Sequence, residues 1–331
     1  MEIGIAFDLK ADFAPAAGEP DDRYEEFDSL ATVEGIERAL ARGGYTTRRL
    51  GGGRKFLENV LAKPCDLVFN IAEGFGTRSR EAHVPSVLEM LKIPYTHSDP
   101  LTLAVTLDKS VAKRLVASHG LATPRFEVVE SVDALRGLEL AYPLFAKPLF
   151  EGSSIGVRKK SRAANADELA ARVAELLADY REPVLVEEYC SGPEFTVGLL
   201  GNGANLRVLG VMEVVSKAVP QAEFVYSLEV KRNDDWHLEV DYLVPPRRPK
   251  AEVDAIEELA RASFRALGCR DLARIDIRAD AHGVPRFLEA NPLPGIKPGW
   301  SDLALLCERA HVEYDDVILG VVAAARERWR L

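Results

Sequence analysis

The stretch that decides the fold is AKPLFEGSSIGV, at residues 146–157. It carries Lys147 in an apolar segment, followed by Gly152 and Gly156 with two serines between them. Glycines let a backbone approach a ligand closely, and successive N–H groups can then donate to phosphate oxygens, beside a lysine ammonium that adds a point charge. The stretch therefore predicts a phosphate-binding loop. The alternative is a β-hairpin turn with a surface lysine, because neither the P-loop spacing nor the dinucleotide fingerprint is present.

The bulk composition limits the partners that the chain can have. Its 331 residues are enough for two or three domains, and a net charge of -10 argues against nucleic acid or an anionic membrane surface. No apolar run approaches the length of about 20 residues that a membrane span needs, and the start MEIGIAFD lacks the basic segment of a signal peptide. The scattered cysteines form no CxxC motif, so we expect reduced thiols in a cytoplasmic protein. They are Cys65, Cys190, Cys269 and Cys307.

Residues 1–97 follow a strand–helix–strand pattern. Alternating or continuous apolar residues predict strands, and an apolar face at helical spacing predicts a helix that two glycines end. The predicted strands are residues 2–7, 45–50 and 65–71, and the predicted helix is residues 28–44. This order predicts an α/β domain with a doubly wound parallel sheet. The GGGRK run at residues 51–55 is interpreted as a plain turn, and residues 8–28 as a long loop.

After residue 97 the pattern changes to mixed helices and strands. Residues 98–183 read as a small α+β lobe with a helix at 166–180, and residues 184–331 as a larger, strand-rich α+β lobe. The chain therefore divides into three predicted domains, at 1–97, 98–183 and 184–331.

Two predicted strands near the C-terminus carry a set of oxygen ligands. Arg274 and Asp276 lie on one face of the first strand, by the period of two, and Glu289 and Asn291 lie on one face of the next. A hairpin would bring Asp276, Glu289 and Asn291 together, and two carboxylates with an amide oxygen suit Mg²⁺ bound jointly with nucleotide phosphates. Arg274 would lie beside that ion. The alternative is a surface hairpin with solvated charges.

Two further segments carry weaker signals. In VEEYCSGPEFTVGLL, the acidic side chains of Glu187 and Glu194 and the strand backbone could hydrogen-bond adenine and ribose. Residues 70–81 follow a buried strand and hold Glu73 at its carboxyl end, where ligands bind in parallel sheets. We expect this segment to contact a substrate or to gate the site; a capped helix start with solvated arginines is the alternative.

Together these features resemble the ATP-grasp superfamily, and within it the D-alanine–D-alanine ligases. The matching stretches occur in the family's order between about residues 105 and 295; they are LDKSVAK, KPLFEGSSIGV, VEEYCSGPEFTVGLL, LEVKR, ARIDIRAD and LEANPLPG. The resemblance implies an ATP-grasp fold, α+β, behind the N-terminal α/β domain. It also implies an ATP-dependent carboxylate–amine ligase that forms a dipeptide through an acyl phosphate and releases ADP and phosphate.

The resemblance also implies which residues form the site. Its nucleotide-binding residues would be Lys109, Lys147, Gly152, Ser153, Ser154, Gly156, Glu187, Glu194 and Lys231. Its metal ligands would be Asp276, Glu289 and Asn291, holding two Mg²⁺ ions, with Mn²⁺ as an alternative. Its catalytic residues would be Ser154, Lys231, Arg274 and Gly295, with Arg274 and the backbone N–H near Gly295 stabilising an oxyanion.

The amino-acid half of the predicted site departs from the family pattern. Family members hold the first substrate's ammonium with a glutamate, for which Glu26 is the candidate here, beside Glu25 and Asp28. Arg232 stands where the family commonly has a tyrosine. After NPLPG, the family's threonine and serine are replaced by IKPGWSDL, so the candidate substrate-binding residues there are Lys297, Trp300 and Ser301.

These departures leave the substrates open. D-alanyl-D-alanine is the product that the resemblance implies, and a ligase for a different amino-acid pair in a specialised biosynthetic pathway is the alternative. A non-catalytic ATP-binding protein on the same fold is a further alternative, against which the complete metal and lysine set argues. The expected partners are small amino acids or amino-acid-like carboxylates, and the family suggests a homodimer.

Overall fold

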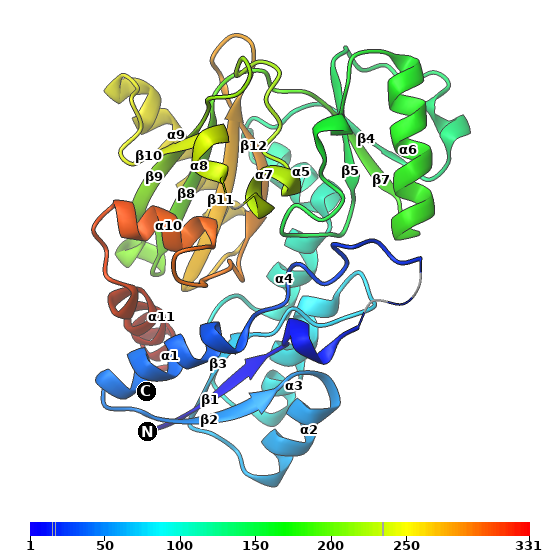
Figure 1. Cartoon of the computed structure of the whole chain (residues 1–331). Helices are drawn as coiled ribbons and strands as arrows, with labels where there is room; N and C mark the ends of the chain where they lie inside the picture. The colour runs from blue at the N-terminus through cyan, green and yellow to red at the C-terminus, as the bar shows by residue number, and fades with distance from the viewer. Residues whose placement is uncertain (15, 17, 234) are drawn as a thin grey trace.

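A computed structural model describes residues 1–14, 16, 18–233 and 235–331 of the chain. Within these residues the chain forms three β-sheets, two of them above an N-terminal unit in the view of Figure 1. No helix of the described ranges is both long and apolar enough to cross a membrane.

The N-terminal unit is built on a parallel sheet with strand order β2-β1-β3. Successive residues of β1 point to opposite faces of the sheet. Ile5 packs in a cluster with helices α1 and α11, and the adjacent Ala6 packs with α2 and α3. The sheet is thus covered on both sides, which confirms the predicted doubly wound arrangement. Its elements are β1 (Glu2–Phe7), α1 (Leu30–Arg42), β2 (Thr46–Gly51), α2 (Gly53–Ala62), β3 (Leu67–Ile71) and α3 (His83–Leu91), with 3₁₀ helices η1 (Lys10–Asp12) and η2 (Arg80–Ala82).

The glycine run at residues 51–55 lies where β2 ends and α2 begins, as a turn requires. Helix α2 itself was not predicted. At Gly52 a Cβ atom would lie 1.8 Å from Oδ1 of Asp8, so the close approach of these two segments needs glycine.

The small lobe holds a four-stranded sheet of order β4-β7-β5-β6, covered by helix α6. Strand β7 pairs with both β4 and β5, so the predicted domain boundary at 183/184 falls inside this sheet, and the sheet ends after Glu188. A side chain of Asn165 caps α6 by accepting a hydrogen bond from the N–H of Glu168. The elements are β4 (Phe126–Val129), β5 (Leu144–Pro148), β6 (Arg162–Ala163), α6 (Ala166–Tyr180) and β7 (Val184–Glu188), with η3 (Val132–Leu135) and η4 (Lys159–Ser161).

Two helices of the predicted small lobe pack elsewhere. Helices α4 (Pro100–Leu107) and α5 (Lys109–Ser118) precede the small sheet in sequence. Ala112 and Val116 of α5 are nevertheless buried in the core of the large lobe, because they form the helix face that meets its sheet. The small lobe is therefore limited to the segment around β4–β7.

The large lobe is built on an antiparallel sheet of order β10-β9-β8-β11-β12. The predicted hairpin is confirmed: Asp276 of β11 pairs with Glu289 of β12, and Arg274 pairs with Asn291. The elements of this lobe are β8 (Glu194–Leu200), β9 (Arg207–Ser216), α7 (Leu228–Arg232), α8 (Trp236–Glu239), β10 (Val240–Leu243), α9 (Lys250–Ala266), β11 (Leu272–Ala279), β12 (Pro285–Asn291), α10 (Asp302–Arg309) and α11 (Tyr314–Trp329), with η5 (Gly203–Asn205).

The last helix returns to the N-terminal unit. Helix α11 lies beside α1 (Figure 1), and Val321 and Ala325 are fully buried in the cluster that includes Ile3 and Ile36. Residues 314–329 therefore cover a face of the N-terminal sheet, although they follow the large lobe in sequence.

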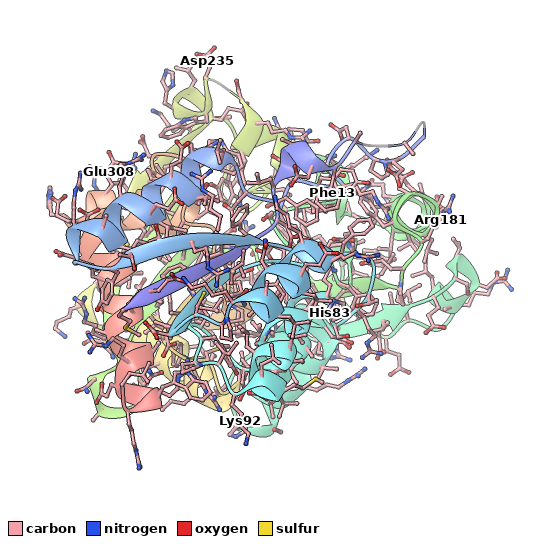
Figure 2. All side chains as sticks on the ribbon, turned by 90° about the horizontal axis from the view of Figure 1, so that it is seen from below. Phe13, His83, Lys92, Arg181, Asp235 and Glu308 are labelled. Atoms are coloured by element: carbon pink, nitrogen blue, oxygen red, sulfur yellow. The ribbon has the colours of Figure 1, made fainter. Side chains whose placement is uncertain are left out.

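The segment between β1 and α1 is a long loop, as predicted, except that residues 15 and 17 lie outside the described residues. Phe13 of this loop packs against Tyr24 and Phe27, with ring centroids 5.4 and 4.5 Å apart. In Figure 2, Phe13 lies on the same side of the molecule as Arg181, which ends α6. The loop thus extends from the N-terminal sheet towards the small lobe.

Candidate active site

The predicted nucleotide and metal residues from separate lobes surround one cavity of about 100 Å³. Strand β5, the loop after it, helix α7 and the β11–β12 hairpin all contribute to its wall. The predicted residues that line it are Lys109, Lys147, Ser154, Glu187, Glu194, Lys231, Arg274, Asp276 and Glu289.

Lys147 is held in this cavity by carboxylates from both lobes. Its Nζ lies 3.0 Å from Glu187 on the neighbouring strand β7 and 3.7 Å from Glu289 on β12. Glu187 also pairs with Lys113, at 2.7 Å, and both of these side chains are almost entirely buried. Burial raises the pKa of Glu187, but the two ammonium groups outweigh it and lower that pKa overall. The carboxylate of Glu187 is therefore used to hold two lysines.

In the same cavity, Lys231 and Arg274 share one carboxylate. The Asp302 carboxylate lies 2.9 Å from Nζ of Lys231 and 3.4 Å from the Arg274 guanidinium, and it accepts a hydrogen bond from the Tyr226 hydroxyl at 2.8 Å. Burial raises the pKa of Asp302, but Lys231 and Arg274 outweigh it and lower that pKa to about 2. Glu194 makes a similar pair with Arg278, at 3.1 Å.

The predicted metal ligands converge as the strand register requires. The Asn291 side chain lies 3.2 Å from the Asp276 carboxylate, which also accepts hydrogen bonds from Arg274 at 2.9 Å. Burial and the charge of Glu289 raise the pKa of Asp276, whereas Lys109 and Lys147 help to lower the pKa of Glu289 to about 2 against the effect of burial. Over the described ranges, no group of three or more His, Cys, Asp or Glu side chains is placed to hold a metal. The candidate set is two carboxylates and an amide.

A second cavity, of about 60 Å³, adjoins the first, because Lys109, Arg274 and Glu289 line both. The predicted residues that line the second cavity but not the first are Glu26, Glu73, Gly152, Ser153, Asn291 and Gly295. Oxygen atoms of Glu26 accept two hydrogen bonds from Arg80, each 3.0 Å long. We call this space the acidic cavity.

The loop at residues 150–157 has the backbone of an anion-binding turn. Ser153 and Ser154 adopt φ of 48° and 62°, and Gly156 adopts 71°. The N–H groups of Ser153 and Ser154 donate no hydrogen bond within the described part of the chain, and a run of such groups suits phosphate oxygens. Gly156 differs from the prediction, since its N–H donates to the Asp22 carboxylate at 2.9 Å.

Four predicted substrate residues line neither of these cavities; they are Arg232, Lys297, Trp300 and Ser301. The Arg232 guanidinium donates to Asp21 and Glu25, at 2.5 and 2.6 Å, so it joins α7 to the N-terminal loop. The ammonium of Lys297 lies 5.2 Å from the ring centroid of Trp300. Arg232, Trp300 and Ser301 line a third cavity of about 200 Å³, which shares Lys231, Arg274 and Asp302 with the first.

Sequence reasoning missed Asp302, Lys113 and Asp22. Asp302 directly follows Ser301 and is the first residue of α10, and no pattern in the sequence assigned it to the site. Lys113 stands in the quoted LDKSVAK stretch and is 0% exposed. Asp22 lies in a polar loop, and nothing in its neighbours pointed to the small lobe.

Comparison with known proteins places this geometry in a family. The family model described as D-ala D-ala ligase C-terminus matches residues 115–323. A D-alanine–D-alanine ligase of Pelotomaculum thermopropionicum is 33% identical over 309 residues, covering 90% of this chain and 92% of that protein. One of Bordetella petrii is 32% identical over 299 residues, covering 90% and 87%.

Solved structures show the same fold over the whole chain. A D-alanine–D-alanine ligase of Bacillus anthracis superposes with a TM-score of 0.74 at 20% identity, covering 100% of this chain and 99% of that one. The VanG D-Ala:D-Ser ligase of Enterococcus faecalis superposes with a TM-score of 0.72 at 20% identity, covering 98% and 99%. The fold is therefore the ATP-grasp fold, and the chain belongs to the D-alanine–D-alanine ligase family.

Proposed function

We propose that this chain is an ATP-dependent carboxylate–amine ligase, similar to D-alanine–D-alanine ligase, that forms a dipeptide through an acyl phosphate and releases ADP and phosphate. The observation that carries the proposal is that Lys147, Lys231 and Glu289, from three separate segments, line one cavity. A carboxylate is a poor electrophile and repels the triphosphate, so cations must converge around the phosphates before the reaction can proceed.

The lysines would contact different phosphate groups of the bound triphosphate. Lys109 and Lys147 would contact its phosphates from the small-lobe side, and Lys231 would reach the γ-phosphate from α7. Glu187 would position Lys147 through the 3.0 Å contact, and Glu194 would bind the ribose. The loop at residues 150–157 would cover the phosphates through the free N–H groups of its serines.

The candidate metal ligands fit Mg²⁺ by the chemistry of their donors. Asp276, Glu289 and Asn291 supply hard oxygen atoms from facing strands, next to the cavity that would hold the phosphates. We propose that they hold two Mg²⁺ ions, with Mn²⁺ as an alternative. Bound there, these ions would neutralise phosphate charge.

The acyl phosphate must be protected and then captured. Such a mixed anhydride hydrolyses readily, so the loop that covers the site excludes water from it. When the amine attacks, Arg274 and the backbone N–H of Gly295 would stabilise the tetrahedral oxyanion. Removing one donor of this kind typically costs about 3 kcal/mol of transition-state stabilisation.

A different amino-acid pair is the second candidate for the substrates, because the third cavity holds Arg232, Trp300 and Ser301 at positions where this chain departs from the family pattern. We propose small amino acids or amino-acid-like carboxylates as partners, without nucleic acid or membrane, and a cytoplasmic location in which the four buried, free cysteines stay reduced. A homodimer is proposed from the family resemblance, and sedimentation velocity tests it.

The domain division that we propose has an N-terminal domain closed by α11, a small lobe ending after Glu188, and a large lobe that includes α4 and α5.

The decisive experiment supplies ATP, Mg²⁺ and a panel of D- and L-amino acids. We expect ADP and phosphate for at least one pair, with a dipeptide detected by mass spectrometry. Release of AMP and pyrophosphate would contradict the acyl-phosphate route, and absence of turnover with bound ATP would favour a non-catalytic protein.

Glu289→Gln tests the metal and phosphate side of the site. We expect ATP binding to be largely kept, because three lysines still face the phosphates, and turnover to fall by about 100-fold or more. Calorimetry with a non-hydrolysable ATP analogue and the ADP assay measure the two effects. Glu58→Gln on the exposed side of α2 is the control, and unchanged turnover in Glu289→Gln would remove this residue from the mechanism.

A further inference from the structure

The acidic cavity is lined by more carboxyl groups than the cations around it pair with. Its wall includes four carboxyl groups of the N-terminal unit, and in the part of the chain that the structure describes only one of these has an arginine partner. They are Glu26, Asp28, Glu73 and Glu81, of which Glu26 pairs with Arg80.

The two cations that line the acidic cavity are used elsewhere. Lys109 donates to the backbone oxygen of Glu151, and Arg274 is bound to Asp276 and Asp302. Neither cation lies within ion-pair distance of Glu73 or Glu81 in the described structure.

Glu81 is the strongest indication of a ligand. Its side chain comes from η2, it lines the cavity, and the residue is only 8% exposed. Within residues 1–14, 16, 18–233 and 235–331 its carboxylate has neither a hydrogen bond nor an ion pair. Burial without a partner disfavours the charged form of this carboxyl group, and a bound cation would stabilise that charged form.

The carboxylates also act on one another. Burial raises the pKa of Glu81 to about 8. The charge of Arg80 lowers this pKa, and the charge of Glu26 raises it, but both effects are smaller than that of burial. Burial, and then the charges of Glu81, Glu26 and Asp28, raises the pKa of Glu73 well above its usual range. All four carboxyl groups line one cavity of about 60 Å³, so one small cationic ligand can meet several of them.

We propose that the acidic cavity binds the carboxylate donor, and that this donor is a short diamino acid whose second amino group lies between Glu73 and Glu81. The proposal rests on the ligase function proposed above and specifies its donor. Glu26 and Asp28 face the α-amino group, and Arg274 and Gly295 lie on the side where the carboxylate reacts. A single ammonium would leave most of this acidic surface unmatched, whereas two ammonium groups match it.

The size of the cavity limits the length of the side chain. Its volume of about 60 Å³ equals the space of only a few water molecules, since one water needs at least about 10–15 Å³ by this measure. A donor with three or four carbons fits, such as 2,3-diaminopropionate or 2,4-diaminobutyrate, whereas lysine and arginine do not.

The first test compares donors on the unmodified enzyme. ADP release is measured with both enantiomers of 2,3-diaminopropionate, 2,4-diaminobutyrate, alanine and 2-aminobutyrate, each with a panel of acceptors. Because a charged hydrogen bond in a buried site contributes about 1.5–3 kcal/mol, we expect kcat/KM for the preferred diamino acid to exceed that for 2-aminobutyrate by about 10- to 100-fold. Equal or better use of alanine or 2-aminobutyrate would overturn the inference and leave the ligase function standing.

The second test uses Glu81→Gln and Glu73→Gln, with the exposed Glu58→Gln as control. Each cavity variant should reduce the ratio of kcat/KM between diamino acid and 2-aminobutyrate by about tenfold, whereas the control keeps it. Thermal unfolding verifies that each variant is folded, and a ratio that does not change in folded variants would overturn the inference.

Calorimetry separates the two proposals. If no amino-acid pair yields ADP and phosphate, the ligase function fails, and binding of 2,3-diaminopropionate in the presence of a non-hydrolysable ATP analogue then decides the inference. Binding that Glu81→Gln weakens about tenfold would support the acidic cavity as a diamine site, and no binding would overturn it.

Discussion

Asp302 illustrates how single residues control the charge of this site. Its carboxylate holds both Lys231 and Arg274 in the cavity that Lys147 also lines. The same carboxylate accepts a hydrogen bond from the Tyr226 hydroxyl. The residue therefore holds two cations at the cavity that we propose for ATP.

Asp302→Asn is expected to show this pairing as a pH-dependent loss of stability. The pKa of Asp302 is lowered to about 2 in the folded chain, so its stabilising contribution is complete above its unfolded pKa near 3.8 and is lost as the pH falls through about 2. The contribution is about 2 kcal/mol at pH 7, and about half of it is lost at pH 3. Urea unfolding at both pH values measures the difference between variant and wild type.

The control for that experiment is Asp254→Asn, which removes an exposed pair with Lys250. Its effect should be small at both pH values, because exposed pairs contribute about 0–1 kcal/mol. A difference between Asp302→Asn and wild type that stayed constant from pH 7 to pH 3 would contradict the assigned pairing.

At the scale of elements, the N-terminal loop is tied to the loop that covers the phosphates. Asp22 is 0% exposed and accepts hydrogen bonds from the N–H of Gly156 and the hydroxyl of Tyr180, at 2.9 and 2.8 Å. It also pairs with Arg158, at 2.8 Å. Arg232 binds the same loop from α7, so elements of three units meet here.

Asp22→Ala should therefore loosen residues 150–157. We expect faster hydrogen exchange in this loop, a higher KM for ATP, and a loss of about 3 kcal/mol of stability, because Arg158 loses its buried partner. Hydrogen-exchange mass spectrometry and urea unfolding measure these effects.

Asp21→Ala is the matched control, since the Asp21 side chain is 70% exposed and its ion pairs lie at the surface. It should cost less than about 1 kcal/mol and leave exchange in the loop nearly unchanged. If both variants behaved alike, Asp22 would have no special role in holding the phosphate loop.

At the scale of the whole molecule, the end of the chain joins the N-terminal unit to the large lobe. Arg328 of α11 pairs with Asp271, which is 0% exposed and lies just before β11, at 2.7 Å. The same guanidinium donates to the backbone oxygens of Tyr95 and His97 after β3. One side chain thus bridges the parallel sheet and the sheet that carries the candidate metal ligands.

Arg328→Met is expected to lower the free energy of unfolding by about 3 kcal/mol, because it leaves a buried carboxylate without its cation. Chemical denaturation followed by circular dichroism measures the loss. Arg330→Met, two residues later and exposed, should change stability by less than about 0.5 kcal/mol. Equal stability of the two variants would show that the bridge contributes nothing.

Much of the architecture followed from local patterns. The strand period of two and the predicted hairpin together indicated that Asp276 and Glu289 would lie close to each other, and the apolar run at residues 65–71 predicted a strand covered on both faces. These predictions succeeded because side-chain direction along a strand depends on neighbouring residues alone.

Other features depended on contacts between distant segments. Residues 184–188 read as the start of the large lobe, yet backbone pairing with β4 and β5 places them in the small sheet. The helix at residues 109–118 has an apolar face that suits any core, and only the tertiary structure decides that it packs against the large lobe.

For the site as well, the sequence predicted some features and only the tertiary structure decided others. Residue types and spacing along the strands identified the cations and carboxylates, because the chemical nature of a side chain is independent of the fold. The partners of those charges came only from long-range packing: Glu187 with Lys113, Arg232 with Asp21, and Asp302 with Lys231. Electrostatic pairing between distant segments decides which charges remain available to a ligand. Such segments can be more than two hundred residues apart in sequence, and only folding brings them together.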